Sequence, residues 1–328
     1  MKKILAIFML MILFMLLGCG ITNDKTTSVG ESAYQVVDIR GTVVAMPAKP
    51  KRIVTLSAST DEIILGMLPT ENVVAINALL DDPVSSSIVK KAQKIRNKIK
   101  NPSLEQIISL QPDLVIVPHW GNAEIVDGLR DVGLNVVVCK GPQSVEDVRE
   151  TTMLLAKAIG EESKGIQLIA KMDEKLKEIK NKVDKIPTEK RKTIILISLM
   201  PSYGGIGCIF DDMCNYAGVV NGVSAAGIKN GQIVGKELLV KINPDILILP
   251  VYNDHGTFDV EAFRKEFLDD PALQTLTAIK EKRLYMPREG YIYNCSQDVV
   301  YGIQEIAFAA YGNDFSQPAD CHISISGE

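Results

Sequence analysis

The sequence predicts an α/β protein with two Rossmann-like lobes joined by one long rigid α-helix. The first observation behind this prediction is an internal repeat. The stretch EQIISLQPDLVIVP at 105–118 returns nearly position for position as ELLVKINPDILILP at 237–250. Each copy holds a Glu, apolar residues at helical spacing, a Pro-Asp turn and a β-branched run closed by Pro, which indicates a short helix leading into a buried parallel strand. Two copies therefore predict two lobes.

The second observation is a long amphipathic stretch between the repeats, at 162–186. Its apolar residues recur at helical spacing, with Lys and Glu elsewhere: Ile166, Ile169, Met172, Leu176, Ile179 and Val183. At 1.5 Å per residue, roughly 24 helical residues reach ~36 Å, which is long enough to connect two lobes. The expected boundaries are an N-terminal lobe at 34–160, the inter-lobe helix at 161–187, a C-terminal lobe at 188–312 and a polar tail at 313–328.

The remaining elements alternate between strand and helix, as the fold class requires. Alternation around Arg40-Gly41 predicts a β-hairpin at 34–44. Runs rich in β-branched and apolar residues predict strands at 52–56, 73–76, 114–117, 136–139, 193–199 and 283–286, and helical spacing predicts further helices at 145–159 and 297–311. Because open parallel sheets bind ligands at the carboxyl ends of their strands, we expect a ligand cleft between the lobes.

The N-terminal segment resembles a bacterial lipoprotein signal. Lys2 and Lys3 precede an apolar run at 4–17, and Leu16-Leu17-Gly18-Cys19 follows. The resemblance implies cleavage before Cys19, whose thiol would carry the lipid that holds the mature chain on the outer face of the cell membrane. An uncleaved signal anchor is the alternative, but it needs a longer apolar segment. Residues 20–33 are rich in Thr, Ser, Asn, Asp and Gly, which predicts a flexible tether.

Composition limits the partners and the redox chemistry. Removing Lys2 and Lys3 from the 36 basic residues leaves 34 against 40 acidic ones, a net charge of −6, which argues against nucleic acid as a partner. Five cysteines remain beyond Cys19, without a C-x-x-C pair: Cys139, Cys208, Cys214, Cys295 and Cys321. This pattern favours buried free thiols over a disulfide framework or a zinc ribbon.

Several stretches together resemble the substrate-binding lipoproteins of ABC importers for iron-siderophore, haem and cobalamin. The resemblance covers residues 35 to about 312, and the segments that carry it are VVDIRGTVVAMPAKPKRIVTLS, SASTDE, PSLEQIISLQPDLVIVP, GKELLVKINPDILILP and LTAIKEKRLYMP. It implies a monomer without enzymatic activity or intrinsic cofactor. Such a protein captures an iron or cobalt chelate and delivers it to an ABC permease dimer with its ATPase subunits.

The same resemblance assigns a role to the two repeated glutamates. In that family, paired surface glutamates meet arginines of the two permease subunits, and they fall here on Glu105 and Glu237. Charge-assisted Glu–Arg hydrogen bonds would fix the register of a pseudo-twofold protein on a twofold partner. The alternative is that a Glu in the first turn of a helix is favoured by the helix dipole, whatever docks there.

Candidate ligand-binding residues lie just beyond the predicted strands. Ser57 and Ser59 are good helix N-cap residues and leave backbone N–H groups at the cleft. His119 and His255 each follow one copy of the repeat and could ligate a haem iron or a bare metal, with Tyr203, Tyr252 or Tyr291 as alternative phenolates. Trp120 suits a flat ligand face and Arg288 a carboxylate or catecholate. The alternative is that these are ordinary polar loop residues.

Two other classes compete with this interpretation. A lipoprotein hydrolase of the penicillin-recognising type needs S-x-x-K together with S-D-N and K-T-G, and the S-x-x-K at 87–90 stands without those partners. A zinc- or manganese-binding lipoprotein of an ABC importer is the closer rival, but its site needs several His with carboxylates. Only His119 and His255 precede residue 312.

Overall fold

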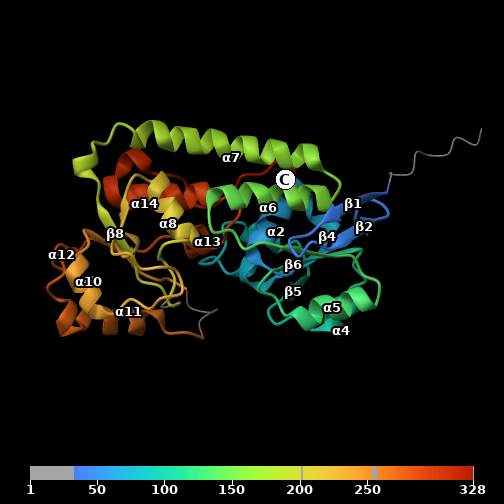
Figure 1. Cartoon of the computed structure of the whole chain (residues 1–328), viewed down its shortest axis with the longest axis horizontal. Coiled ribbons are helices and arrows are strands. Elements are labelled where there is room, and N and C mark those ends of the chain that lie inside the picture. The colour runs from blue at the N-terminus through green and yellow to red at the C-terminus, as the bar shows by residue number, and fades with distance from the viewer. Residues whose placement is uncertain (1–32, 201, 253–256, 328) are drawn as a thin grey trace, which may run out of the picture. The chain divides into compact units, whose positions relative to one another are not determined.

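The computed structural model describes residues 33–200, 202–252 and 257–327. The expectations for Cys19, for the signal and tether at 1–32 and for His255 fall outside the described residues. Residues from Ala33 onward form one compact unit, which contains two parallel sheets, so the predicted α/β fold class is confirmed. Figure 1 shows both sheets with the long helix α7 (Glu162–Val183) running past them.

The N-terminal lobe is built on a five-stranded parallel sheet with strand order β5-β4-β3-β6-β7. Its strands are β3 (Ile53–Thr55), β4 (Val73–Asn77), β5 (Asn97–Ile99), β6 (Leu114–Pro118) and β7 (Val136–Cys139). The sequence does not predict β5, because Asn97 and Lys98 give this edge strand a polar character. The chain moves outward from β3 through β4 and returns to the other side of β3 as β6, so the direction of winding switches between β3 and β6.

The C-terminal lobe repeats this arrangement in a four-stranded parallel sheet with order β11-β10-β8-β9. Its strands are β8 (Thr193–Leu196), β9 (Val220–Asn221), β10 (Ile246–Ile248) and β11 (Leu284–Tyr285). Here the winding switches between β8 and β10. The predicted hairpin is present as the antiparallel pair β1 (Tyr34–Val37) and β2 (Val43–Met46).

Helices cover both faces of each sheet. In the N-terminal lobe they are α2 (Ala58–Met67), α3 (Val89–Ala92), α4 (Leu104–Ser109), α5 (Ala123–Asp131) and α6 (Val145–Ala158). In the C-terminal lobe they are α8 (Ile209–Tyr216), α9 (Gly222–Ala225), α10 (Lys236–Ile242), α11 (Val260–Asp269), α12 (Thr277–Lys280), α13 (Glu289–Tyr293) and α14 (Val299–Tyr311). Short 3-10 turns at 70–72, 78–81, 188–190, 271–273 and 313–315 complete the described elements.

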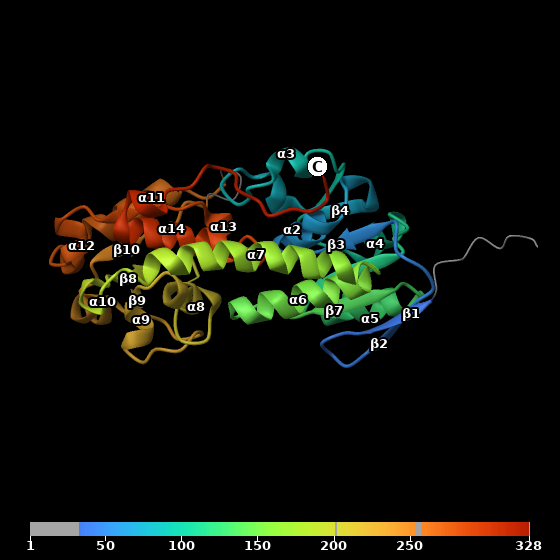
Figure 2. The same ribbon diagram turned by 90° about the horizontal axis from the view of Figure 1, so that it is seen from above.

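Helix α7 contacts α2 and α6 of one lobe and α8 and α14 of the other. Figures 1 and 2 show it alongside both groups. Its buried face differs at one end from the predicted stripe, because Ile166 is 61% exposed and Leu168 is buried instead. The reason is Gly165, which faces α6 so closely that an added Cβ would lie 2.5 Å from the Cβ of Ala156. This close approach sets the rotation of the helix.

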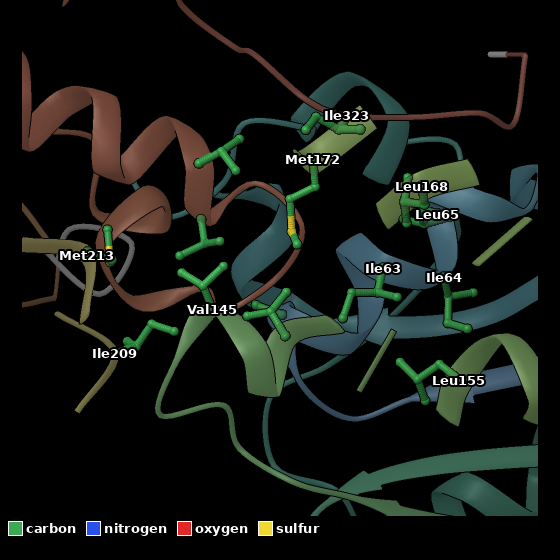
Figure 3. Close-up of a cluster of buried hydrophobic side chains, with 14 of the residues drawn as sticks. Ile63, Ile64, Leu65, Val145, Leu155, Leu168, Met172, Ile209, Met213 and Ile323 are labelled. Carbon is green, nitrogen blue, oxygen red and sulfur yellow. The ribbon is translucent and has the colours of Figure 1, made fainter. Parts of the chain in front are cut away.

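One hydrophobic core runs through both lobes. It combines buried side chains of α2, α6, α7, α8 and α14 with the inner faces of both sheets. Figure 3 shows part of it, with Ile63, Leu155, Met172 and Met213 converging from four of these helices. A separate cluster lies between each sheet and its outer helices. The lobes are therefore joined by packed side chains as well as by the chain itself.

The C-terminal segment at 313–327 is more than the expected polar tail. The backbone N–H of Ile325 donates to the carbonyl of Gly66 at 2.8 Å, and that of Ile323 donates to Asp298 Oδ1 at 2.8 Å. Phe315 and Ile323 are buried in the shared core. The segment is polar on average, but these buried apolar residues and the hydrogen bond to Gly66 attach it to the rest of the protein, including α2 of the N-terminal lobe.

Gly290 marks a close contact between the lobes. A Cβ at this position would lie 2.3 Å from the backbone carbonyl oxygen of Ser85 in the opposite lobe. We expect Gly290→Ala to cost about 1–3 kcal/mol through overpacking, although Ala is the better helix former. Thermal unfolding of the two proteins measures this loss.

Gly128→Ala in α5 is the matched control, since its Cβ would meet only the flexible side chain of Leu104, at 3.1 Å. An unchanged melting temperature for Gly290→Ala would mean that the lobes separate here without cost.

Candidate functional site

A pocket of about 580 Å³ lies between the two lobes at the carboxyl ends of their strands. Its lining is mainly apolar and aromatic, with a few polar groups: Leu79, Ser85, Ser198, Leu199, Met200, Tyr252, Phe258, Glu289, Gly290, Tyr293 and Asn294. Segments after β8 and β10 contribute, so the pocket sits where the winding of the C-terminal sheet switches. That is the position at which open α/β sheets bind ligands.

The N-terminal lobe supplies the wall that follows β4. Asp82 holds this loop by accepting the N–H of Val84 at 2.8 Å. The carbonyl of Ser85 accepts the Asn294 side-chain amide at 2.9 Å, which fastens the loop to the opposite lobe. The wall is thus fixed by hydrogen bonds on both sides.

The C-terminal lobe supplies the larger, aromatic wall. Tyr293 donates to Ser198 Oγ at 2.8 Å, and the same oxygen accepts the N–H of Met200 at 3.0 Å. The ring of Tyr203 packs behind Tyr293, with 5.1 Å between the ring centroids. These contacts hold the aromatic surface rigid before a ligand arrives, which lowers the entropy cost of binding.

Glu289 is the charged side chain among the lining residues. Its carboxylate accepts the backbone N–H of Val251 at 3.2 Å, in the segment that follows β10. Burial raises the pKa of Glu289 to about 7, and Asp82 adds to the rise, while the N–H groups of Val251 and Tyr252 and the charge of Arg264 oppose it. Near neutral pH this group can therefore either accept or donate a hydrogen bond.

Behind the pocket, a buried carboxylate of α2 links the lobes. Glu62 accepts Asn294 Nδ2 at 2.9 Å and Ser296 Oγ at 2.6 Å, and its carbonyl accepts Gln297 Nε2 at 3.0 Å. Burial raises the pKa of Glu62 well above its usual range, and Asp298 raises it further. Asn294 thus connects the pocket wall to the interior of the opposite lobe.

Among the residues predicted to bind ligand, Tyr252 lines this pocket. Ser57 is the N-cap of α2 and contacts the hydroxyl of Thr60 at 2.9 Å, and Ser59 lies in the first turn. The hydroxyl of Tyr203 is buried and has no hydrogen-bond partner among the described residues; burial raises its pKa well above the usual value. Tyr203 thus supports the wall instead of lining it.

Trp120, the residue after His119, lies at a second hollow, of about 390 Å³, at the switch point of the N-terminal sheet. Trp120 lines it and is 60% exposed. His119 Nδ1 accepts the N–H of Gly141 at 2.8 Å, so Nε2 carries the proton of the neutral ring and neither nitrogen offers a free lone pair to a metal. The structure does not bring these two side chains into the main pocket.

Arg288 and Tyr291 point to other partners. The Arg288 guanidinium donates to the carbonyl of Ser86 at 2.7 Å and pairs with Asp320. Tyr291 is buried and donates to the carbonyl of Cys321 at 2.8 Å. Both residues fasten the start of α13 to neighbouring segments, and neither lines the pocket.

Sequence reasoning missed several lining residues, notably Ser85, Ser198, Phe258 and Asn294. Glu289 lies in the segment at 288–293, which follows a predicted strand, but the sequence indicates Arg288 and Tyr291 as the candidates there. The strand predicted at 193–199 includes Ser198, but β8 ends at Leu196. The sequence feature that could indicate such residues is a polar side chain directly after an apolar run. This feature is weak evidence, because most such side chains only form hydrogen bonds with the backbone of a turn.

Two further observations bear on other kinds of site. A larger hollow of about 1040 Å³ lies by the end of α7, is lined by several lysines, and shares no lining residue with the pocket between the lobes. Within 33–200, 202–252 and 257–327, no group of three His, Cys, Asp or Glu side chains could hold a metal ion. The five cysteines in these ranges are free thiols.

The repeated glutamates occupy equivalent exposed positions, Glu105 in the first turn of α4 and Glu237 in the first turn of α10. One turn later the repeat places Ile108 and Val240, each 37% exposed. Both lobes therefore present a carboxylate beside an apolar side chain. The helix-dipole explanation accounts for the glutamates but not for the exposed apolar partners.

Comparison with known proteins agrees with this architecture. Residues 53–289 match the family model described as periplasmic binding protein. An uncharacterized ABC transporter substrate-binding lipoprotein, YvrC of Bacillus subtilis, is 27% identical over 92% of this chain and 95% of its own length. The iron-uptake system-binding protein of the same organism is 23% identical over 87% and 91%.

Solved structures agree as well. The apo form of the periplasmic haem-binding protein RhuT from Roseiflexus sp. RS-1 superposes with a TM-score of 0.69 at 22% identity, covering 81% of this chain and 99% of that one. At this identity the likeness concerns the fold.

The raised pKa of Glu289 predicts a pH-dependent stability difference for Glu289→Gln. The folded state holds this proton up to about pH 7, against an ordinary value of 4.5. The wild type therefore loses stability as pH rises between these values, whereas Gln stays neutral. We expect the melting temperature of the variant, relative to wild type, to rise by a few degrees from pH 4.5 to pH 8, since about 1 kcal/mol corresponds to 2–4 °C.

Asp61 and Glu62 titrate in both proteins, so their contributions cancel in this comparison. A difference in melting temperature that does not change with pH would show that Glu289 is solvated like a surface carboxylate.

Proposed function

The chain belongs to the periplasmic binding protein family and serves as the substrate-binding component of an ABC importer, not as an enzyme, and we propose that it captures an iron or cobalt chelate. The supporting observation is the pocket between the lobes, whose walls are fixed by hydrogen bonds before ligand arrives. Its volume of about 580 Å³ lies within the ~300–1,000 Å³ typical of small-molecule sites. The ligand leaves chemically unchanged, since capture and release are the whole task.

A bare zinc or manganese ion is the competing cargo. Such an ion needs several His or carboxylate ligands converging on one point. The described lining offers the single carboxylate of Glu289 and no histidine. The apolar and aromatic surface instead suits a chelate that brings its own metal ligands.

Titration calorimetry with a ferric siderophore, haem and a corrinoid, together with zinc and manganese salts, tests this proposal. We expect one chelate to bind with submicromolar affinity and the bare ions not to bind. If haem is the cargo, Tyr252→Phe would shift its Soret band, because Tyr252 lines the pocket. Tight binding of zinc or manganese without any chelate would assign the protein to the competing class.

We further propose that Glu105 and Glu237 dock the protein on its permease. Their equivalent exposed positions support this, as do the apolar neighbours Ile108 and Val240. A twofold permease would meet one carboxylate from each lobe.

Reversing both glutamates to Arg should reduce uptake in cells by at least tenfold, because each Glu–Arg pair becomes a repulsion. The affinity of the purified double variant for its ligand should stay unchanged, since neither residue lines the pocket. Glu174→Arg on the exposed side of α7 is the matched control for added positive charge. Normal uptake by the double variant would contradict docking at these residues.

We also propose that Cys19 is the lipid-modified first residue of the mature chain and anchors it on the outer face of the cell membrane. It is supported by the order of the positive, apolar and Leu-Leu-Gly-Cys segments. No helix in the described part of the chain is both long and apolar enough to cross a membrane.

Cys19→Ala should therefore abolish lipid attachment, because the thiol is the acceptor of the lipid. Mass spectrometry of the mature N-terminus and membrane fractionation would measure this, with Cys321→Ala as the control for loss of a thiol elsewhere. A Cys19→Ala protein that is still cleaved at the same bond and remains on the membrane would contradict the proposal.

A further inference from the structure

We propose that this pocket selects its chelate by charge: it takes a ferric chelate without net negative charge, and it prefers one whose cationic group meets Glu289. This inference rests on the proposed function and narrows it. It excludes anionic chelates such as ferric catecholates, although such ligands also need a large cleft.

The first step concerns the charged groups in the pocket. Of the lining residues, Glu289 carries a formal charge and the others are neutral. The polar lining groups, such as the hydroxyls of Ser198 and Tyr293, already bond to each other. No Lys, Arg or His lines the described part of the pocket, so an anionic ligand would find no cation there.

The second step concerns two arginines close to Glu289. Arg264 donates to the carbonyl of Pro250 at 3.0 Å and pairs with Glu261. Arg288 donates to the carbonyls of Pro83 and Ser86 and pairs with Asp320. Each guanidinium is thus held by carbonyls and a carboxylate, and redirecting it to a ligand would break those contacts.

The third step concerns the acidic groups around Glu289. Asp82 lies close enough to Glu289 to raise the pKa of that carboxyl group. Charges in a partly dry site act more strongly than in water. Their sum favours a cation in the pocket and repels an anion.

The formal charges of ferric chelates indicate which class of ligand this negatively charged pocket would take. Three singly charged hydroxamates cancel the charge of Fe(III), whereas three doubly charged catecholates leave the complex strongly negative. A hydroxamate chelate with a free terminal ammonium group would carry one positive charge. That group can form a charge-assisted hydrogen bond with the Glu289 carboxylate.

The experiment compares two ferric trihydroxamates that differ only at one end, one with a free ammonium group and one with that amine acetylated. At pH 8, we expect the ammonium form to bind wild-type protein at least tenfold more tightly, consistent with a hydrogen bond between charged groups. Glu289→Gln should bring the two affinities within about twofold. A ferric tris-catecholate should bind at least a hundredfold more weakly than either.

Glu266→Gln is the matched control, because it removes one exposed carboxylate from α11 outside the pocket. It should leave the tenfold preference intact. Equal affinity of the two trihydroxamates for wild type, or tight binding of the tris-catecholate, would overturn selection by charge while leaving chelate capture standing. Failure of every chelate to bind would overturn the proposed function itself.

Discussion

The packing of α7 against both lobes is the constraint on which the rest of this structure depends. Its buried stripe joins α2 and α6 on one side and α8 and α14 on the other in one hydrophobic core. Separating the lobes would expose this apolar surface, at roughly 25 cal/mol for each Å². Because protein interiors are close-packed and shift little without cost, the distance between the two pocket walls is set mainly by this core.

Hydrogen bonds across the boundary between the two lobes add a directional constraint to that packing. Glu62 is buried, and leaving its carboxyl group without hydrogen-bond partners would cost free energy. The hydrogen bonds that it accepts from Asn294 and Ser296 therefore favour the arrangement in which the two lobes meet. The C-terminal segment adds hydrogen bonds to Gly66 and Asp298 at the same boundary. Apolar packing thus brings the lobes together, and these buried hydrogen bonds fix the register in which they meet.

The pocket inherits its chemistry from this arrangement. Its aromatic wall is held by side chains that already bond to each other, and the arginines near it are occupied by carbonyls and carboxylates. Glu289 is left as the group whose charge faces a ligand, with a pKa near 7 because burial disfavours its carboxylate. A large, mostly apolar chelate fits such a surface better than a bare ion, which would lack ligands there.

The sequence by itself determined the α/β class, the repeated unit, the long helix and most strands, because apolar periodicity and turn residues act locally. It also indicated Tyr252 as a candidate, and this residue lines the pocket. Only the tertiary structure decided which side chain of each segment faces the pocket: Glu289 faces it, while its neighbour Arg288 reaches the opposite lobe. Likewise Leu168 is buried in place of Ile166 because Gly165 lets α6 approach closely. Such choices depend on contacts between residues far apart in the chain, and a local pattern carries no record of those contacts.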